Sequence, residues 1–218
     1  MHNPSAILFG AIGSVVESSE LQYQSFIAAF RDAGLDWVWE REAYKEMLRK
    51  PGGLERIRQY AISKGDQIDP EAIYAGKNEH FHRGLRENPP ALRQGVADVI
   101  EHCRAAGKPL GFVTTTTRST LNTLFEVIDG ISAEDFSFIG DRTLVDKGKP
   151  APDIYQLALR EIGFDAKRNE VLAIEDSPSS RTSAIDAGLA CVFFPGAYIL
   201  DRPDEVEAVS NLTDVISV

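Results

Sequence analysis

The sequence is poor in cysteine and has no long apolar run. Its two cysteines among 218 residues, Cys103 and Cys191, stand among apolar neighbours, which favours free buried thiols over a disulfide or a metal pair. Residues 1–9 lack the basic start and the extended apolar core of a secretory signal. No run approaches the length of a membrane-spanning helix. We therefore expect a cytoplasmic protein with no membrane partner.

Basic charge is also scarce, because 33 acidic residues outnumber 23 basic ones and the formal net charge is −10. A field of this sign repels nucleic acid and anionic lipid surfaces, so neither is expected as a partner. A local basic pocket for one small phosphate remains compatible with this charge. The length and the 43% hydrophobic content suit one well-cored domain with a small insertion.

Short apolar runs alternate with helical patterns over the second half of the chain, and the first of these helices is expected to run from Leu92 to Ala106. Such runs, each typical of a buried strand, occur at 7–9, 110–114, 136–139, 171–175 and 190–194. Continuous apolar strands separated by helices predict a parallel sheet covered on both faces.

No strand pattern appears between residues 16 and 89, where helical spacings recur and an Asn-Pro-Pro run at 88–90 marks a linker. We predict an α/β fold, with a Rossmann-like, doubly wound parallel sheet core formed by residues 1–15 and 90–218. An all-helical cap, residues 16–89, is expected to be inserted after the first strand.

The first strand ends in a glycine-containing turn without an acid. Residues 6–18 read AILFGAIGSVVES. The carboxyl end of such a strand is where ligands bind in a doubly wound sheet. Side chains two residues apart leave a strand in the same direction. Here those positions hold Gly10 and Ile12, which offer only hydrogen and hydrocarbon.

The later strand ends carry polar residues instead. Thr114 and Thr115 lie between an apolar strand and a helix N-terminus, a place that attracts anions. The stretch GKPAPD at 148–153 supplies a lysine, Lys149, and the strand at 171–175 ends in two acids. The alternative role for the threonine run 114–117, and for Asp176 or Ser177, is to cap the helix that follows. For Thr116 and Thr117 capping is the favoured role, and for Thr114 phosphate binding is favoured.

In this order the segments resemble the motifs of the haloacid-dehalogenase-like (HAD) hydrolases, over about residues 5–196. The resemblance implies that Thr114, Thr115 and Lys149 hold a phosphate group. It also implies that Glu175 and Asp176 hold Mg²⁺.

The first motif of that family contains two aspartates, one attacking phosphorus and the other protonating the leaving oxygen. Gly10 and Ile12 replace them here, so the resemblance implies a degenerate first motif, no remaining catalytic residue and a weakened Mg²⁺ site.

The run KPGGLERI at 50–57 resembles the cap specificity loop of the β-phosphoglucomutase-like branch of the family. Within that branch it is most similar to the loop of the sugar-bisphosphate phosphatases. Arg56 would then meet a distal phosphate as a planar fork. The alternative is an ordinary solvated charge on a helix.

These features predict a phosphatase-like protein that binds a phosphorylated small molecule or inorganic phosphate and is catalytically impaired. The alternative is an active metal-dependent phosphatase, in which Glu175 and Asp176 hold a metal whose bound water replaces the aspartate. A third interpretation, a scaffold that binds another protein through the cap, has no positive support in the sequence.

Overall fold

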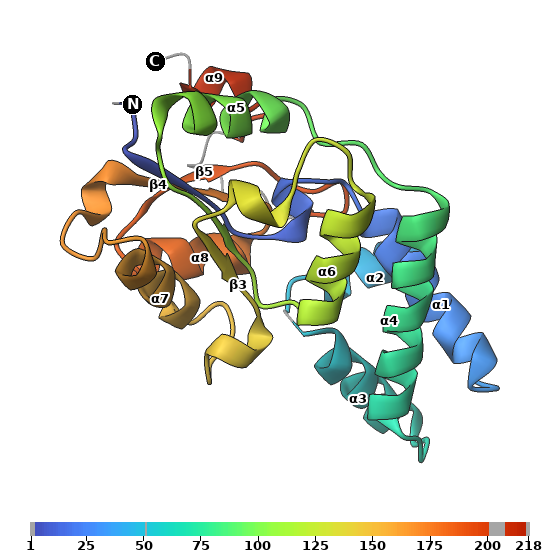
Figure 1. Cartoon of the computed structure of the whole chain (residues 1–218). Helices are drawn as coiled ribbons and strands as arrows, with labels where there is room; N and C mark the ends of the chain where they lie inside the picture. The colour runs from blue at the N-terminus through green and yellow to red at the C-terminus, as the bar shows by residue number, and fades with distance from the viewer. Residues whose placement is uncertain (1–2, 51, 201–207, 217–218) are drawn as a thin grey trace.

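Five parallel strands form one sheet in the order β3-β2-β1-β4-β5 in the computed structural model (Figure 1). The structure describes residues 3–50, 52–200 and 208–216, so Pro51 of the predicted cap loop lies outside the described residues. The strands are β1 (Ala6–Phe9), β2 (Leu110–Val113), β3 (Phe138–Gly140), β4 (Val171–Glu175) and β5 (Ala190–Phe193). This arrangement confirms the predicted Rossmann-like fold.

Helices connect the strands and cover the sheet. The α-helices are α1 (Ser19–Asp32), α2 (Arg41–Met47), α3 (Gly53–Lys64), α4 (Pro70–Glu87), α5 (Val96–Ala106), α6 (Arg118–Val127), α7 (Asp153–Glu161), α8 (Pro178–Asp186) and α9 (Thr213–Ile216). Within the described residues, no helix is both long and apolar enough to cross a membrane.

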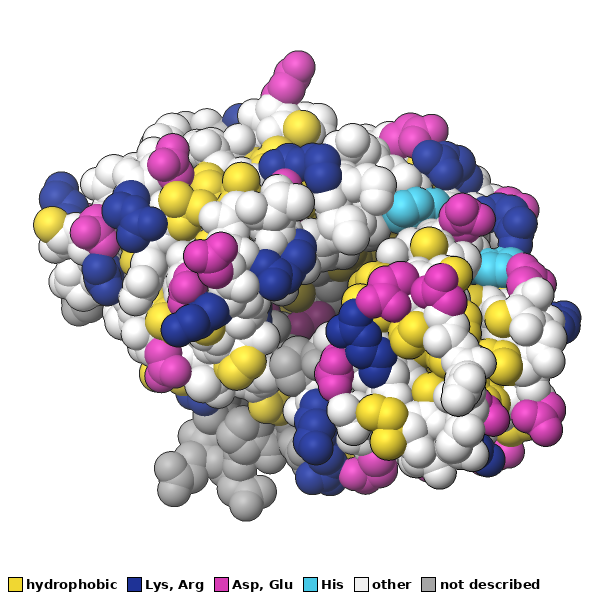
Figure 2. All heavy atoms as spheres, turned by 90° about the horizontal axis from the view of Figure 1, so that it is seen from below, with side chains coloured by type: hydrophobic (Ala, Val, Ile, Leu, Met, Phe, Trp, Pro, Cys, Tyr) yellow, Lys and Arg dark blue, Asp and Glu magenta, His cyan; other side chains and the backbone are white. Residues whose placement is uncertain are grey.

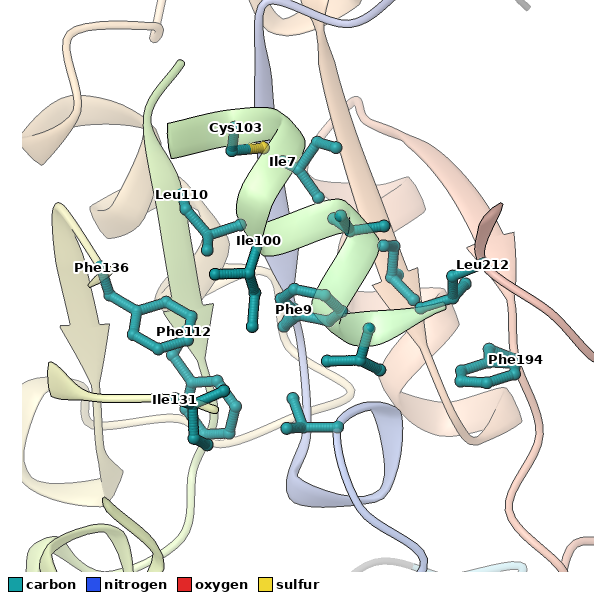
Figure 3. Close-up of a cluster of buried hydrophobic side chains, with 14 of the residues drawn as sticks. Ile7, Phe9, Ile100, Cys103, Leu110, Phe112, Ile131, Phe136, Phe194 and Leu212 are labelled. Atoms are coloured by element: carbon teal, nitrogen blue, oxygen red, sulfur yellow. The ribbon is translucent and has the colours of Figure 1, made fainter. Parts of the chain in front are cut away.

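Alternate residues of β1 enter two separate apolar clusters, one on each face of the sheet. Ile7 and Phe9 lie beside Ile100 and Cys103 of α5 (Figure 3) and share a cluster with residues of α6 and α9. Ala6 and Leu8 belong to a cluster with residues of α7 and α8. Every residue of β1 is buried. Because both faces are covered, the strand reads as a continuous apolar run rather than an alternating one.

Helices α1 to α4, here called the inserted helices, follow β1 and lie beside the sheet (Figure 1). They enclose an aromatic cluster of their own, which includes Phe26, Phe30 and Trp39. Helix α4 begins where the sequence indicates, because Asp69 accepts a hydrogen bond from the Ala72 amide at 3.0 Å and proline follows it.

The chain leaves the sheet and returns to it at one place. Val16 and Leu92 form an isolated antiparallel bridge, and the amide of Arg93 donates to the carbonyl of Val15 at 2.9 Å. The inserted helices also contact α6 through side chains. His82 of α4 lies 2.9 Å from Thr120, and Arg86 and Glu126 form an exposed ion pair at 3.0 Å.

Two expected boundaries are wrong. Strand β3 begins at Phe138 rather than at residue 136, because a short 3-10 turn at Ala133–Asp135 precedes it. Helix α5 begins at Val96 rather than at Leu92, because Leu92 pairs with Val16 and the helix starts after Gly95, whose φ is 83°.

Candidate active site

A cavity of about 310 Å³ lies where β1, β2 and β4 end, between the sheet and the inserted helices. Thr114 and Asp176 line it from the sheet side, and Gln22 and Arg56 line it from α1 and α3. A second cavity of about 200 Å³ adjoins it, because Gln22 and Arg56 line both. Figure 2 shows a hollow between the two halves of the molecule, with acidic and basic side chains interspersed around it. Two of the predicted strand-end residues, Thr114 and Asp176, thus face the same space as the predicted cap.

The end of β1 brings no reactive group to this space. Gly10 is buried, its amide donates to the carbonyl of Ile174 at 2.9 Å, and its carbonyl accepts from Lys149 Nζ at 2.5 Å. Ile12 is 8% exposed and belongs to the apolar cluster on one face of the sheet. The carboxylate of Glu17, farther along the turn, accepts hydrogen bonds from the backbone amides of Ser19 and Ala197. Both of its oxygens are therefore engaged by backbone amides.

The space beside Gly10 is filled by two other side chains. A Cβ atom on Gly10 would lie 2.1 Å from Glu175 Oε1 and 2.2 Å from the hydroxyl oxygen of Tyr155. Glu175 comes from the end of β4 and Tyr155 from α7. Both distances are far below van der Waals contact, so only glycine fits at position 10 while these side chains keep their places.

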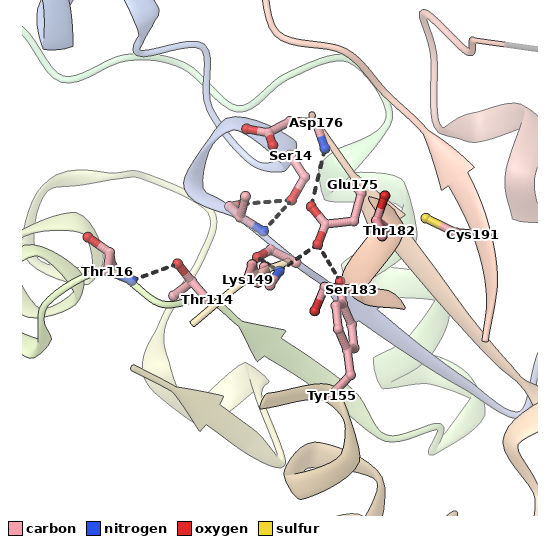
Figure 4. Close-up of polar contacts among 12 residues, drawn as sticks. Ser14, Thr114, Thr116, Lys149, Tyr155, Glu175, Asp176, Thr182, Ser183 and Cys191 are labelled. Carbon is pink, nitrogen blue, oxygen red and sulfur yellow. Dashed lines mark hydrogen bonds and ion pairs between the residues drawn. The ribbon is translucent and has the colours of Figure 1, made fainter. Parts of the chain in front are cut away.

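Lys149 and Tyr155 converge on the carboxylate of Glu175 (Figure 4). Lys149 Nζ and the Tyr155 hydroxyl donate to the same oxygen, Oε1, at 2.5 and 2.6 Å. The side chains of Lys149 and Glu175 are 4% and 0% exposed. Burial, together with the negative charge of Glu175, raises the pKa of Tyr155 well above its usual value, so the hydroxyl keeps its proton and donates.

Asp176 is the acid that faces the cavity. Burial raises its pKa to about 6, and the neighbouring charge of Glu175 acts in the same direction. Gly13 makes room for it, since a Cβ atom there would lie 2.0 Å from Asp176 Oδ2. Ser177, the residue before α8, makes no side-chain capping bond, so its suggested capping role is not observed.

Mg²⁺, the metal that the resemblance implies, requires several oxygen ligands in octahedral geometry. Here the carbonyl of Gly10 is bound to Lys149, and Glu175 is bound to Lys149 and Tyr155. No group of three or more acidic, histidine or cysteine side chains suited to a metal occurs among the described residues. As arranged, these groups do not fit Mg²⁺. Of the two predicted metal ligands, only Asp176 is not bonded to Lys149 or Tyr155, so the predicted weakened Mg²⁺ site would depend mainly on this one carboxylate.

The threonines after β2 divide between two roles. Thr114 is 5% exposed and lines the cavity, and its hydroxyl accepts from the amide of Thr116 at 3.1 Å. Thr115 is not among the described residues that line the cavity. Thr117 caps α6 by accepting from the amide of Thr120 at 3.3 Å. The capping alternative therefore applies to Thr117, and Thr114 remains at the cavity wall.

Arg56 points inward from α3. Its guanidinium donates to the backbone carbonyls of Met47 and Lys50 and lies 5.6 Å from the centre of the Tyr44 ring. Burial lowers its pKa. These contacts differ from those of a solvated helix charge. Within the part of the chain that the structure describes, no carboxylate pairs with Arg56.

A second buried cation, Lys77, was not identified from the sequence. It is 5% exposed, bonds to Gln22 and lies 4.8 Å from the centre of the Phe81 ring. Burial and, to a lesser extent, the charge of Arg56 lower its pKa to about 7. The signal was its position, because Lys77 stands four residues from both Ile73 and Phe81 on the buried stripe of α4.

The family comparison agrees with this fold. The family model described as haloacid dehalogenase-like hydrolase matches residues 5–188. The chain belongs to this family.

Individual relatives place it more narrowly. The chain is 38% identical over 213 residues to the protein CbbY of Cereibacter sphaeroides, covering 96% of this chain and 91% of the relative. It is 33% identical over 207 residues to CbbY of Rhodobacter capsulatus, covering 93% and 89%. It is thus a member of the sugar-phosphate phosphatase- and phosphomutase-like part of the family.

Solved structures show the same relationship. The crystal structure of CbbY from Rhodobacter sphaeroides in complex with phosphate superposes with a TM-score of 0.84 at 34% identity, covering 94% of this chain and 92% of that chain. A mutant of that protein was solved in complex with xylulose-(1,5)bisphosphate. The β-phosphoglucomutase of Clostridium difficile shares the fold, with a TM-score of 0.74 at 16% identity, covering 95% and 92%.

Proposed function

We propose that this chain binds a phosphorylated small molecule in the cavity between the sheet and the inserted helices, and that it hydrolyses phosphate esters negligibly. The observation that carries the proposal is a pair of cations, the partly buried Arg56 and the buried Lys77, that line this space without a carboxylate partner among the described residues. Buried charges are costly unless they are paired, so an anionic ligand is the natural partner.

The chemistry of the strand end supports the second half of the proposal. Gly10 and Ile12 supply neither a nucleophile nor a proton donor. Loss of a covalent nucleophile commonly lowers the rate on the order of a million-fold. The alternative, water activated on a metal held by Glu175 and Asp176, would require Glu175 to give up its bonds to Lys149 and Tyr155. No contact in the site favours that exchange.

The ligand class follows from the relatives and from the cavity. A CbbY structure holds xylulose-(1,5)bisphosphate, so a sugar phosphate or sugar bisphosphate is the class we propose for this chain. Arg56 and Lys77 would hold one phosphate group by charge. Thr114 remains in the proposal because its side chain faces the same cavity. The division of the chain into core and cap, with the cap closing over the ligand, is part of this proposal.

Calorimetry with xylulose 1,5-bisphosphate and assays of phosphate release test the two halves separately. We expect binding by the unmodified chain, binding at least about tenfold weaker in Lys77→Met, and unchanged binding in the control Lys64→Met, since Lys64 is exposed on α3. Phosphate release should stay at background. Release at an ordinary enzymatic rate, retained through repeated purification, would refute the proposed loss of catalysis.

A further inference from the structure

We propose that Glu175 is a built-in anion, which occupies the place of an acidic side chain at position 10 and closes the Lys149 end of the site to phosphate. The inference rests on the proposed function and adds to it. It assigns the phosphate group of the ligand to the end of the cavity between Arg56 and Lys77.

The first argument is spatial. The Glu175 carboxylate lies where a side chain on residue 10 would begin, because a Cβ on Gly10 would be 2.1 Å from its Oε1 and 2.2 Å from its Cδ atom. The Tyr155 hydroxyl donates to the same oxygen at 2.6 Å, holds the carboxylate in this position and itself lies 2.2 Å from the Cβ position. The space left by the smallest side chain is therefore filled by an anion from another strand.

The second argument concerns charge. Lys149 donates at 2.5 Å to both Glu175 and the Gly10 carbonyl, and only 4% of its side chain is exposed. It is not one of the described residues that line the cavity. A phosphate at this end would have to displace a buried carboxylate from an ion pair, which is strongly unfavourable. It would also approach the carboxylate of Asp176.

The third argument is the contrast with the other end of the space. Arg56 uses its guanidinium on backbone carbonyls, and Lys77 bonds to the neutral amide of Gln22. Neither cation is neutralised by a described carboxylate, and both line the adjoining cavity. The electrostatic attraction for a dianion therefore lies on the inserted helices rather than at the strand ends.

Calorimetric titration with inorganic phosphate tests the inference on the full chain. The unmodified protein should bind one phosphate, and Lys149→Met should change its affinity by less than about twofold, against a loss of at least about tenfold in Lys77→Met. Glu175→Gln is nearly isosteric and removes the internal negative charge. It should gain a second phosphate, which is lost again in the double variant Glu175→Gln/Lys149→Met.

Two outcomes would overturn the inference. These are loss of phosphate binding in Lys149→Met with Lys77→Met unaffected, and a folded Glu175→Gln variant that gains no phosphate site. If the unmodified chain binds no phosphate but Glu175→Gln does, the role of Glu175 stands and the proposed function fails.

A crystal of the unmodified chain soaked in phosphate provides the second measurement if the substituted chains do not fold. Phosphate density between Arg56 and Lys77 supports the inference, and density on Lys149 contradicts it. If the soaked crystal shows phosphate density at neither place, the contact between Glu175 and Lys149 decides. An intact ion pair supports the role of Glu175, and a separated pair contradicts it.

Discussion

Restoring an acid at the end of the first strand, by Gly10→Asp, should destabilise the protein and should not restore catalysis. The new Cβ would begin 2.1 Å from Glu175 Oε1 and 2.2 Å from the Tyr155 hydroxyl. Neither neighbour is the free end of an exposed side chain, because both are fully buried and bonded to each other. The added carboxylate would have to force them apart.

The magnitude follows from two costs. Inserting atoms into a filled interior typically costs about 1–3 kcal/mol. The aspartate also places a second carboxylate beside Glu175, to which Lys149 is the only cation bonded among the described residues. For a chain of this size about 1 kcal/mol corresponds to roughly 2–4 °C in Tm. The packing cost alone therefore predicts a fall in Tm of about 2–12 °C, and the charge cost acts in the same direction.

Differential scanning calorimetry measures the fall, and release of phosphate from 4-nitrophenyl phosphate measures catalysis. Gly76→Ala is the matched control, because a Cβ there meets its nearest neighbour at an ordinary 3.9 Å. Replacing that mid-helix glycine should raise stability by roughly 0.5–1 kcal/mol. A Gly10→Asp variant as stable as the unmodified chain, or one with turnover of about 1 s⁻¹ or faster, would show the reasoning to be wrong.

The remaining predictions concern a cap, a core side chain and a buried lysine. Asp69→Ala removes the capping bond to Ala72 and should cost about 1 kcal/mol in urea unfolding, whereas an unchanged midpoint would contradict the capping role. Phe112→Ala, at a fully buried strand position, should cost about 3–5 kcal/mol, and a loss below about 1 kcal/mol would contradict the close packing. Lys77, with a pKa of about 7, is neutral above that pH, so sulfate affinity should fall by up to tenfold per pH unit from pH 7 to 8.5, as binding then requires proton uptake. The slope should be absent in Lys77→Met, and an equal slope in both proteins would assign the titration elsewhere.

The sheet could be predicted because its determinants are local. Strands β1, β2 and β4 are buried on both faces, and their apolar runs show this directly in the sequence. The wrong start of α5 arose from tertiary structure, since Leu92 continues a helical pattern but pairs with Val16 instead. A pairing between distant segments overrides local periodicity and leaves no local signal.

The candidate site was predictable as a set of positions but not as a set of contacts. The motifs indicated Thr114, Lys149 and Glu175, yet nothing in them shows that Lys149 turns to a carbonyl 139 residues away. The occupation of the space beside Gly10 depends on three elements packing together, which only the folded chain displays. Lys77 was missed because lysine is almost never buried without a partner, and its place on an apolar stripe was not recognised.

The bridge between Val16 and Leu92 has a mechanical consequence. The chain leaves the sheet at Val16 and returns at Leu92, and these two segments lie side by side. The inserted helices are therefore attached at one point, and a rotation about this point strains no other backbone connection. Such a swing would break the polar contacts of His82 with Thr120, of Arg86 with Glu126 and of Tyr198 with Glu20. The exposed pair of Arg86 and Glu126 is replaced at little cost by contacts with water. A ligand would thus gain entry by rotation of a preformed lobe, without unfolding of any helix.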